Sequence, residues 1–279
     1  MFGTLRRWRR SRVLARAQLD EPTWARTLRR LEFTRVLSAD ERERLRELTI
    51  LFLHEKQFSA AHGLALTELM RIHVAAQACM LILNLGLDYY RGWREVLLYP
   101  AQFVPRHQYT DEMGVVHQGD QPYSGEAWLR GPVILSWEDV AKTEYPDGVN
   151  VVIHEFAHKL DMLNGAANGF PPLHRDMSRQ AWVGAFTAAY QDFCARVDAG
   201  EDTIIDPYAS ESPGEFFAVF SEAFFELPDV VRSEYPAVYE QLGYFYRQDP
   251  LARLERRPSM AARSSHGSWI RSEGVKGRA

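Results

Sequence analysis

The chain contains 279 residues, of which 46% are hydrophobic and 25% are charged. This composition is typical of one large globular domain, or at most two modest ones, and it excludes a fibrous or disordered chain. The formal net charge is −4, so no overall positive charge favours a nucleic-acid partner.

Both ends of the chain are rich in arginine. Arginine fills five of the seven positions from Arg6 to Arg12, and residues 255–279 are rich in Arg, Ser and Gly. The N-terminal run lacks the apolar segment and the cleavage site of a secretory signal. We therefore predict a basic, exposed N-terminal arm over residues 1–30 and a flexible Arg/Ser-rich tail over residues 255–279. Weak adhesion of the arm to an anionic surface is the alternative to a purely solvated role.

After this arm, the first hundred residues have mainly helical patterns. Residues 38–53 begin with an N-cap at Ser38 and continue with an amphipathic period, and residues 67–83 predict a second helix. The most apolar stretch, residues 74–87, is interrupted by Gln77 and is too short to span a bilayer. We therefore predict a buried core helix there and no transmembrane segment.

Two short segments predict a small sheet in front of the next helices. Residues 95–99 end at Pro100, and residues 131–137 follow a region rich in turn residues. Three further helices are predicted, over residues 150–163, 177–197 and 215–226.

The sequence contains two cysteines, Cys79 and Cys194. Both lie in apolar helical contexts, and they are too few and too poorly spaced for a disulfide framework or a cysteine-based zinc site. A soluble protein of the reducing cytoplasm fits this usage best.

The most informative segment runs from His154 to His158 and is an HExxH sequence inside the predicted helix 150–163. Residues i and i+4 of a helix lie on one face, so His154 and His158 can present two imidazole nitrogens to one metal ion. Glu155 lies close enough to take a proton from water near that ion. The motif therefore predicts a zinc-dependent hydrolase.

A catalytic zinc site commonly has three protein ligands, and the motif supplies two. Asp161 and Asn164 occupy the positions where a glycine and a third histidine would continue the motif. The third ligand must come from elsewhere, and the best source is the predicted helix 215–226. Glu215 and Glu222 share one face of this helix but lie about 10 Å apart, so both cannot bind one ion.

Local chemistry does not separate these two glutamates. Glu222 lies mid-helix among aromatic residues, where an unpaired carboxylate is costly, so burial favours it as a ligand. Glu215 has a structural explanation, because Ser212 and Glu215 have the spacing of a capping box, with Pro213 at the first helical position. From the residues alone, both remain candidates.

Two segments carry a family resemblance. Residues 150–161 read Asn-Val-Val-Ile-His-Glu-Phe-Ala-His-Lys-Leu-Asp, and residues 206–225 read Asp-Pro-Tyr-Ala-Ser-Glu-Ser-Pro-Gly-Glu-Phe-Phe-Ala-Val-Phe-Ser-Glu-Ala-Phe-Phe. Together they resemble the Mlc titration factor A (MtfA) family of bacterial zinc metallopeptidases. The spacing between the tyrosine and the first helical glutamate is also similar to that of the more distant anthrax lethal factor catalytic domain.

The resemblance covers about residues 31–254 and implies a zincin-like metallopeptidase domain over that range. The implied fold class is α+β, mainly helical, with a small β-sheet beside the active-site helix. His154, His158 and Glu215 correspond to the ligands of one zinc ion per chain.

Further roles follow from the same resemblance. Glu155 corresponds to the general base, and Tyr208 corresponds to a residue near the metal that can hydrogen-bond a developing oxyanion. Glu222 becomes a candidate for orienting a ligand histidine from outside the ligand set. Asp161 is a second candidate for that role, although a solvent-exposed carboxylate at a helix end explains Asp161 equally well.

At the level of function, the resemblance implies hydrolysis of peptide bonds in peptide or protein substrates, with aminopeptidase-like action as the expected mode. Such action needs an acidic group that captures the substrate's α-amine, and Glu211 and Glu222 are candidates. Family members bind Mlc, a repressor of glucose-uptake genes. An Mlc-like repressor and a link to the glucose phosphotransferase system are therefore expected, without direct nucleic-acid contact.

The alternative is a non-catalytic, zinc-containing protein that binds and sequesters a transcriptional regulator. The intact Glu155 speaks against it, because a purely structural site needs no general base and tends to close its fourth position with protein.

Overall fold

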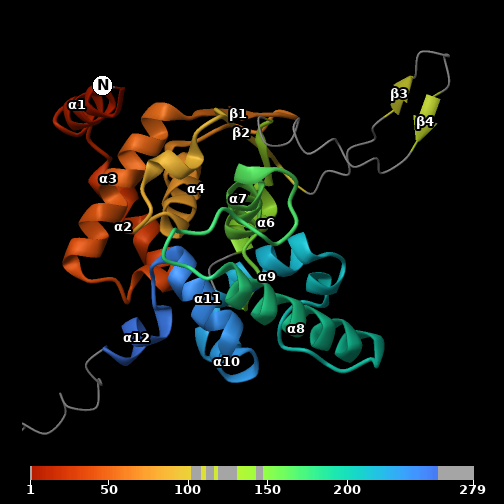
Figure 1. Ribbon diagram of the computed structural model, residues 1–279. Coiled ribbons are helices and arrows are strands. Elements are labelled where there is room, and N and C mark those ends of the chain that lie inside the picture. Colours follow the sequence, from red (N-terminus) through yellow and green to blue (C-terminus); the bar gives the residue numbers. More distant parts are fainter. Residues whose placement is uncertain (1, 102–107, 111–115, 119–130, 143–146, 257–279) are drawn as a thin grey trace, which may run out of the picture.

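The computed structural model describes residues 2–101, 108–110, 116–118, 131–142 and 147–256, and helices make up most of this part of the chain (Figure 1). The α-helices are α1 (Phe2–Leu14), α2 (Glu21–Arg30), α3 (Ala39–Glu55), α4 (Glu68–Leu81), α6 (Trp137–Lys142), α7 (Val151–Asp161), α8 (Arg179–Asp198), α9 (Pro213–Glu226), α10 (Pro228–Glu234), α11 (Pro236–Tyr246) and α12 (Pro250–Glu255). Short 3-10 helices connect them: η1 (Glu32–Thr34), η2 (Leu87–Tyr90), η3 (Met162–Asn164) and η4 (Pro207–Ser210).

A small parallel sheet lies beside the helix that carries the HExxH motif. Its strands are β1 (Gln57–Ala60), β2 (Glu95–Tyr99) and β5 (Val133–Ser136), in the order β1-β2-β5, and β5 packs against α7. The strands β3 (Gln108–Thr110) and β4 (Val116–Gln118) form a separate antiparallel pair. The predicted fold class, α+β and mainly helical with a small sheet, is confirmed.

The sequence does not predict β1, because Phe58 is the only large apolar residue in its four positions. Its partner β2 alternates buried and partly exposed residues, which is the pattern that identified it. The parallel register places Gln57 opposite Glu95 and Val96 opposite Val133. Backbone pairing with β2 therefore stabilises β1 although β1 contains few apolar residues.

The helix α7 lies between the two halves of the molecule. Figure 1 shows α1 to α4 and the sheet on one side of α7, and α8 to α11 on the other. On the first side, Phe156 of α7 packs against Phe52, Tyr90 and Trp93, with ring centroids 5.7, 5.2 and 5.7 Å away. On the other side, α7 packs directly along α9. The motif helix is thus held from both sides by core packing.

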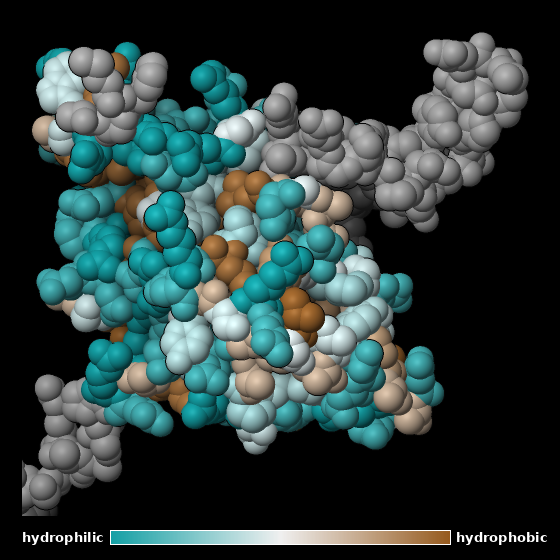
Figure 2. All heavy atoms as spheres, in the orientation of Figure 1, coloured by the Kyte–Doolittle hydropathy of each residue, from teal (hydrophilic) through white to brown (hydrophobic). Residues whose placement is uncertain are grey.

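The helix α4 is the buried core helix that the sequence predicts. Its residues from Ile72 to Leu81 are nearly inaccessible, and Cys79 among them is a free cysteine, as is Cys194. Within the described ranges, no helix is both long and apolar enough to cross a bilayer. Figure 2 shows that hydrophilic residues cover most of the visible face and that apolar residues form small separate groups.

The N-terminal segment differs from the exposed arm that the sequence predicts. Residues 2–14 and 21–30 form α1 and α2, and Trp24 is only 6% exposed. Arg10 of α1 pairs with Glu55 at 2.8 Å and with Asp88 at 2.9 Å. The sequence does not predict this arrangement, because the arginine run looks uniformly solvated. In the structure Arg6 and Arg10, one turn apart, pair with acidic residues, while Arg7 and Arg9 are exposed. The proposed division at residue 31 remains a proposal, and residues 257–279 of the predicted tail lie outside the described residues.

The loop after α7 fixes where α9 begins. Gly169 has a φ of 73°, and a Cβ there would lie 2.4 Å from the carbonyl oxygen of Pro213, the first residue of α9. The Gly169 N–H donates to a carboxylate oxygen of Asp161 at 2.7 Å, and its carbonyl accepts from the indole of Trp182 at 3.0 Å. Gly169 therefore contacts both Asp161 at the end of α7 and Pro213 at the start of α9.

We expect Gly169→Ala to lower the free energy of unfolding by about 3 kcal/mol or more, because the Cβ adds a clash with Pro213 to the strain of a left-handed alanine. Gly200→Ala is the matched control, since Gly200 also has a φ of 73° but nothing lies within 4 Å of its Cβ position. This control should lose only about 1 kcal/mol. Urea denaturation measures both values, and equal losses would contradict the packing argument.

Candidate metal centre

The helix α7 presents the two motif histidines on its less buried face. Asn150 is the N-cap, and its side chain accepts the Ile153 N–H at 3.1 Å. Val152, Ile153, Phe156, Ala157 and Leu160 are fully buried on the remaining surface of the helix. His154 and His158 are only partly buried, one turn apart, because the apolar residues around them fix the rotation of the helix.

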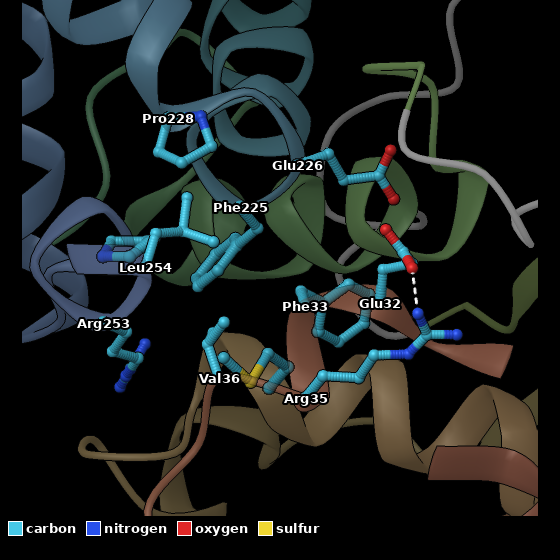
Figure 3. Close-up of a pocket in the computed structure, with 11 residues that line it drawn as sticks. Glu32, Phe33, Arg35, Val36, Phe225, Glu226, Pro228, Arg253 and Leu254 are labelled. Carbon is cyan, nitrogen blue, oxygen red and sulfur yellow. Dashed lines mark hydrogen bonds and ion pairs between the residues drawn. The ribbon is translucent and has the colours of Figure 1, made fainter. Parts of the chain in front are cut away.

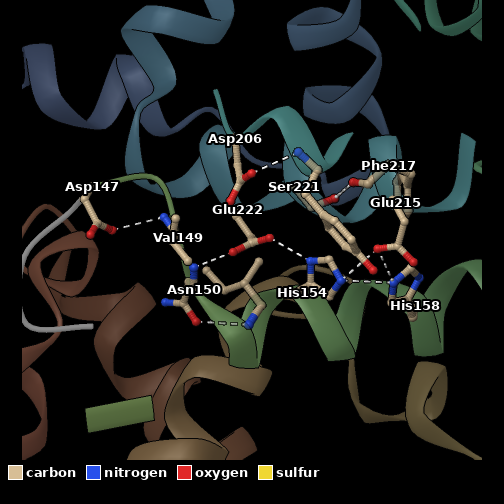
Figure 4. A network of polar contacts seen from close by, with 12 residues as sticks. Asp147, Val149, Asn150, His154, His158, Asp206, Glu215, Phe217, Ser221 and Glu222 are labelled. Carbon is tan, nitrogen blue, oxygen red and sulfur yellow. Dashed lines mark hydrogen bonds and ion pairs between the residues drawn. The ribbon is translucent and has the colours of Figure 1, made fainter. Parts of the chain in front are cut away.

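Three ligand-type atoms converge at this face (Figure 4). The Nε2 atoms of His154 and His158 lie 3.1 Å apart, and the Oε2 atom of Glu215 lies 3.0 Å from the first and 3.2 Å from the second. Donors about 2.0–2.1 Å from a tetrahedral ion are themselves ~3.3 Å apart. The two imidazoles and the carboxylate therefore fit one metal ion in composition and in spacing.

Glu215 reaches the histidines from the first turn of α9. Ser212 caps this helix by accepting the Glu215 N–H at 3.2 Å, and Pro213 occupies the first helical position. The second half of a capping box is absent, because the Glu215 carboxylate points to the histidines. Burial opposes ionisation of Glu215, but the hydrogen bonds from His154 and His158 lower its pKa to about 2. The backbone N–H of Glu215 thus belongs to the helix cap, while its carboxylate lies at the metal cluster.

Glu222 lies on the opposite side of His154 and does not join the cluster. Its Oε1 atom is 2.8 Å from the Nδ1 atom of His154, and its side chain is almost completely buried. An Nδ1–H that donates to this carboxylate orients the ring so that Nε2 points toward Glu215. Burial lowers the pKa of His154, but the hydrogen bonds to Glu215 and Glu222 outweigh it and raise this pKa to about 10. These surroundings favour positive charge at the cluster.

Asp161 is not the exposed helix-end carboxylate that one reading of the sequence predicts. It is completely buried, and it accepts the Gly169 N–H. Burial raises its pKa to about 6, against opposing hydrogen bonds from the backbone of residues 168–170. Among the described residues, it makes no hydrogen bond to His154 or His158. Its observed contact is with the loop that leads to α9.

Glu155 and Tyr208 lie beside the cluster. Glu155 is partly buried on α7, and Tyr208, in η4, has its ring centroid 6.1 Å from that of His154. Burial raises the pKa of Tyr208, and the nearby charges of Glu215, Glu211, Glu155 and Asp206 raise it further. The phenol therefore stays protonated at neutral pH and remains a hydrogen-bond donor.

Three polar residues around the helix start were not identified as site residues from the sequence. The Asn150 side chain donates to Gln77 and to Glu226, with both distances 2.8 Å. Gln77 interrupts an apolar helix, and a buried polar residue of this kind needs a partner. A polar residue there indicates that a contact exists, but the partner, Asn150, lies 73 residues away, so the local sequence does not identify it.

A separate pocket of about 100 Å³ lies near the C-terminal end of α9 (Figure 3). Its lining comes from segments that are far apart in the sequence, namely Glu32, Phe33, Arg35, Val36, Met80, Phe225, Glu226, Pro228, Pro250, Arg253 and Leu254. None of the three ligand-type residues lines it. We place the functional site at the metal cluster, because the groups with suitable chemistry converge there and not in this pocket.

Comparison with known proteins agrees with this chemistry. The family described as "Glucose-regulated metallo-peptidase M90" matches residues 5–247. Proteins named "Mlc titration factor A" from Yersinia pestis (strain Pestoides F) and Yersinia pseudotuberculosis serotype O:1b (strain IP 31758) are each 39% identical to this chain over 224 residues. The aligned region covers 79% of this chain and 82% of each relative. The resemblance predicted from the two sequence segments is confirmed.

The polar network predicts a pH-dependent effect of Glu226. Burial raises its pKa to about 8, helped by the charges of Glu222 and Asp147 and opposed by its hydrogen bonds with Asn150 and Gly148. Between the usual pKa of 4.5 and this value, the folded state binds more protons than the unfolded state. The free energy of unfolding therefore falls as the pH rises through this window.

We expect Glu226→Gln to match wild type near pH 4.5 and to be more stable by about 4 kcal/mol at pH 8. Urea denaturation at several pH values checks this, with the difference between the two proteins as the measured quantity. A difference that stays constant with pH would show that Glu226 titrates normally.

Proposed function

Because the chain belongs to the glucose-regulated metallo-peptidase M90 family, we propose that it is a zinc-dependent peptidase whose ion is held by His154, His158 and Glu215. The observation that carries the proposal is the convergence of two imidazole nitrogens and one carboxylate oxygen on a partly buried face. Two imidazoles and one carboxylate are a usual ligand set for a catalytic zinc that keeps one position open. When bound, zinc acts as a Lewis acid that makes water a better nucleophile and polarises a carbonyl.

Glu155 is the proposed general base. It directly follows the first ligand histidine and, like His154, it is partly buried on α7. Its charge acts on both Tyr208 and Lys159, which places its carboxylate near the cluster. There it can accept a proton from the attacking water and pass it to the leaving amine.

Tyr208 is the proposed donor to the oxyanion that develops on the scissile carbonyl. Its ring lies beside His154, and about half of the residue is exposed, so a substrate can reach the hydroxyl. Burial and the nearby carboxylates raise its pKa, so the phenol stays protonated, as a donor must be.

The proposed substrate is a peptide with a free α-amine. Of the two candidate amine-binding groups, Glu222 is almost fully buried and hydrogen-bonded to His154, whereas Glu211 is exposed. The Glu211 N–H donates to the Tyr208 carbonyl at 3.1 Å, so Glu211 lies next to the proposed oxyanion donor. We therefore assign amine capture to Glu211.

The relatives named Mlc titration factor A suggest a partner as well. We propose that this chain binds an Mlc-like repressor in the cytoplasm and thereby affects regulation of the glucose phosphotransferase system. A second candidate function is sequestration of that repressor without catalysis. The Glu155 position beside the cluster favours the enzyme, because sequestration needs no general base.

We expect Glu155→Gln to bind zinc like wild type but to lose at least about 1,000-fold in kcat, because the amide cannot accept the proton. Hydrolysis of fluorogenic peptides with free and with blocked N-termini measures the loss and identifies the mode of cleavage. Removal of zinc with a chelator should abolish wild-type cleavage, and added zinc should restore it. Equal cleavage by zinc-loaded wild type and Glu155→Gln would exclude this role, and no cleavage by either would favour sequestration.

Tyr208→Phe should lower kcat by about 100-fold with little change in zinc affinity, because it removes one donor to the oxyanion and no ligand. Tyr244→Phe is the matched control, since Tyr244 is similarly exposed on α11 and, within the described part of the chain, its hydroxyl hydrogen-bonds only to Glu240. The control should keep wild-type kcat and KM. A comparable loss in both variants would contradict a specific role for Tyr208.

A further inference from the structure

The backbone of Asn150 is tied to the metal centre at two points. Its carbonyl accepts the His154 N–H at 2.9 Å, which is the first hydrogen bond of α7. Its own N–H donates to Oε2 of Glu222, whose other oxygen is 2.8 Å from the Nδ1 atom of His154 (Figure 4). One carboxylate of α9 therefore contacts both the residue that starts α7 and the ring of the first candidate ligand.

The side chain of Asn150 is fixed just as completely. Its oxygen accepts the Ile153 N–H at 3.1 Å, and its amide nitrogen donates to Gln77 of α4 and to Glu226 of α9, with both distances 2.8 Å. The residue is completely buried. An ordinary N-cap needs only the first of these bonds, so the two contacts of the amide nitrogen are additional.

These contacts replace one half of a capping box. In a capping box, the residue three positions into the helix accepts the N-cap N–H. In α7 that residue is Ile153, which cannot accept, and Glu222 does so from the neighbouring helix instead. One oxygen of Glu222 thus accepts the Asn150 N–H while the other lies against the His154 ring.

We propose that Asn150 is a positioning residue for the metal centre. Gln77 and Glu226 anchor its side chain, the anchored residue fixes the N–H that holds Glu222, and Glu222 sets the orientation of the His154 ring. Partners of a ligand histidine that lie outside the ligand set change metal affinity by 10- to 100-fold when they are removed. The inference rests on the proposed function, because it concerns affinity for the ion that His154 helps to hold.

Asn150→Ser separates this role from simple capping. Serine is as good an N-cap as asparagine, but its hydroxyl is too short to reach Gln77 and Glu226. Zinc affinity is measured on the full chain by competition with a chelator, and the visible spectrum of bound cobalt reports the coordination geometry. We expect Asn150→Ser to weaken zinc binding by about 10-fold, the lower end of this range because the effect passes through Glu222, and to change the cobalt spectrum.

Two controls distinguish orientation from loss of stability. Ser178→Ala removes the N-cap of α8, whose side chain accepts the Ala181 N–H at 3.2 Å, and should lower stability without changing zinc affinity. The double variant Asn150→Asp with Glu226→Gln exchanges donor and acceptor between positions 150 and 226. The new carboxylate at position 150 accepts from the new amide at position 226, and the Gln77 amide can turn to donate to it as well. We expect its zinc affinity to lie within about threefold of that of Glu226→Gln alone.

Zinc binding by Asn150→Ser equal to that of wild type, or a double variant as weak as Asn150→Ser, would overturn the inference. If Asn150→Ser does not fold, Glu226→Leu tests the same anchor with the cap intact: severalfold weaker binding supports the inference, and unchanged binding overturns it. Failure of wild type to bind zinc would instead refute the proposed function, and the inference with it.

Discussion

The imidazole of His154 lies between two carboxylates of one helix, and the rest of the site depends on this contact. Glu215 approaches one ring nitrogen and Glu222 the other, at 3.0 and 2.8 Å. These glutamates are seven residues apart, so they project from the same face of α9 two turns from each other. A histidine fits between them only if α7 lies directly along α9, and this requirement fixes how the two helices pack.

The aromatic core makes this packing rigid. Phe156 anchors α7 to the N-terminal half, while Phe216 and Phe220 of α9 stack on each other with centroids 3.9 Å apart, at a position where Phe193 also packs. Buried carboxylates are costly unless they are hydrogen-bonded. Here the aromatic side chains hold α7 against α9, and the carboxylates of Glu215 and Glu222 are both hydrogen-bonded to His154.

Much of this arrangement could be predicted from the sequence where the signal is local. The i, i+4 spacing of His154 and His158 identified the motif helix, and Ser38, predicted as an N-cap, starts α3, where the structure shows a full capping box with Glu41. The choice between Glu215 and Glu222 could not be made locally, because both carboxylates are partly or fully buried and only their opposite positions around His154 separate them. The family resemblance made that choice. The contacts of Asn150 with Gln77 and Glu226, and of Asp161 with Gly169, depend on tertiary packing that no short window contains.

The contacts that build the centre are distant in the sequence, and this has a consequence for the order of events in a growing chain. His158 meets Glu215 across 57 residues, and Asn150 meets Glu222 across 72. A nascent polypeptide that has just exposed α7 offers two histidines with no carboxylate to complete or orient them. Only after the ribosome has released α9 do both glutamates become available together. The three ligand-type groups can therefore come together only late in biosynthesis, and a truncated product that ends before α9 would leave the ribosome with the two histidines alone.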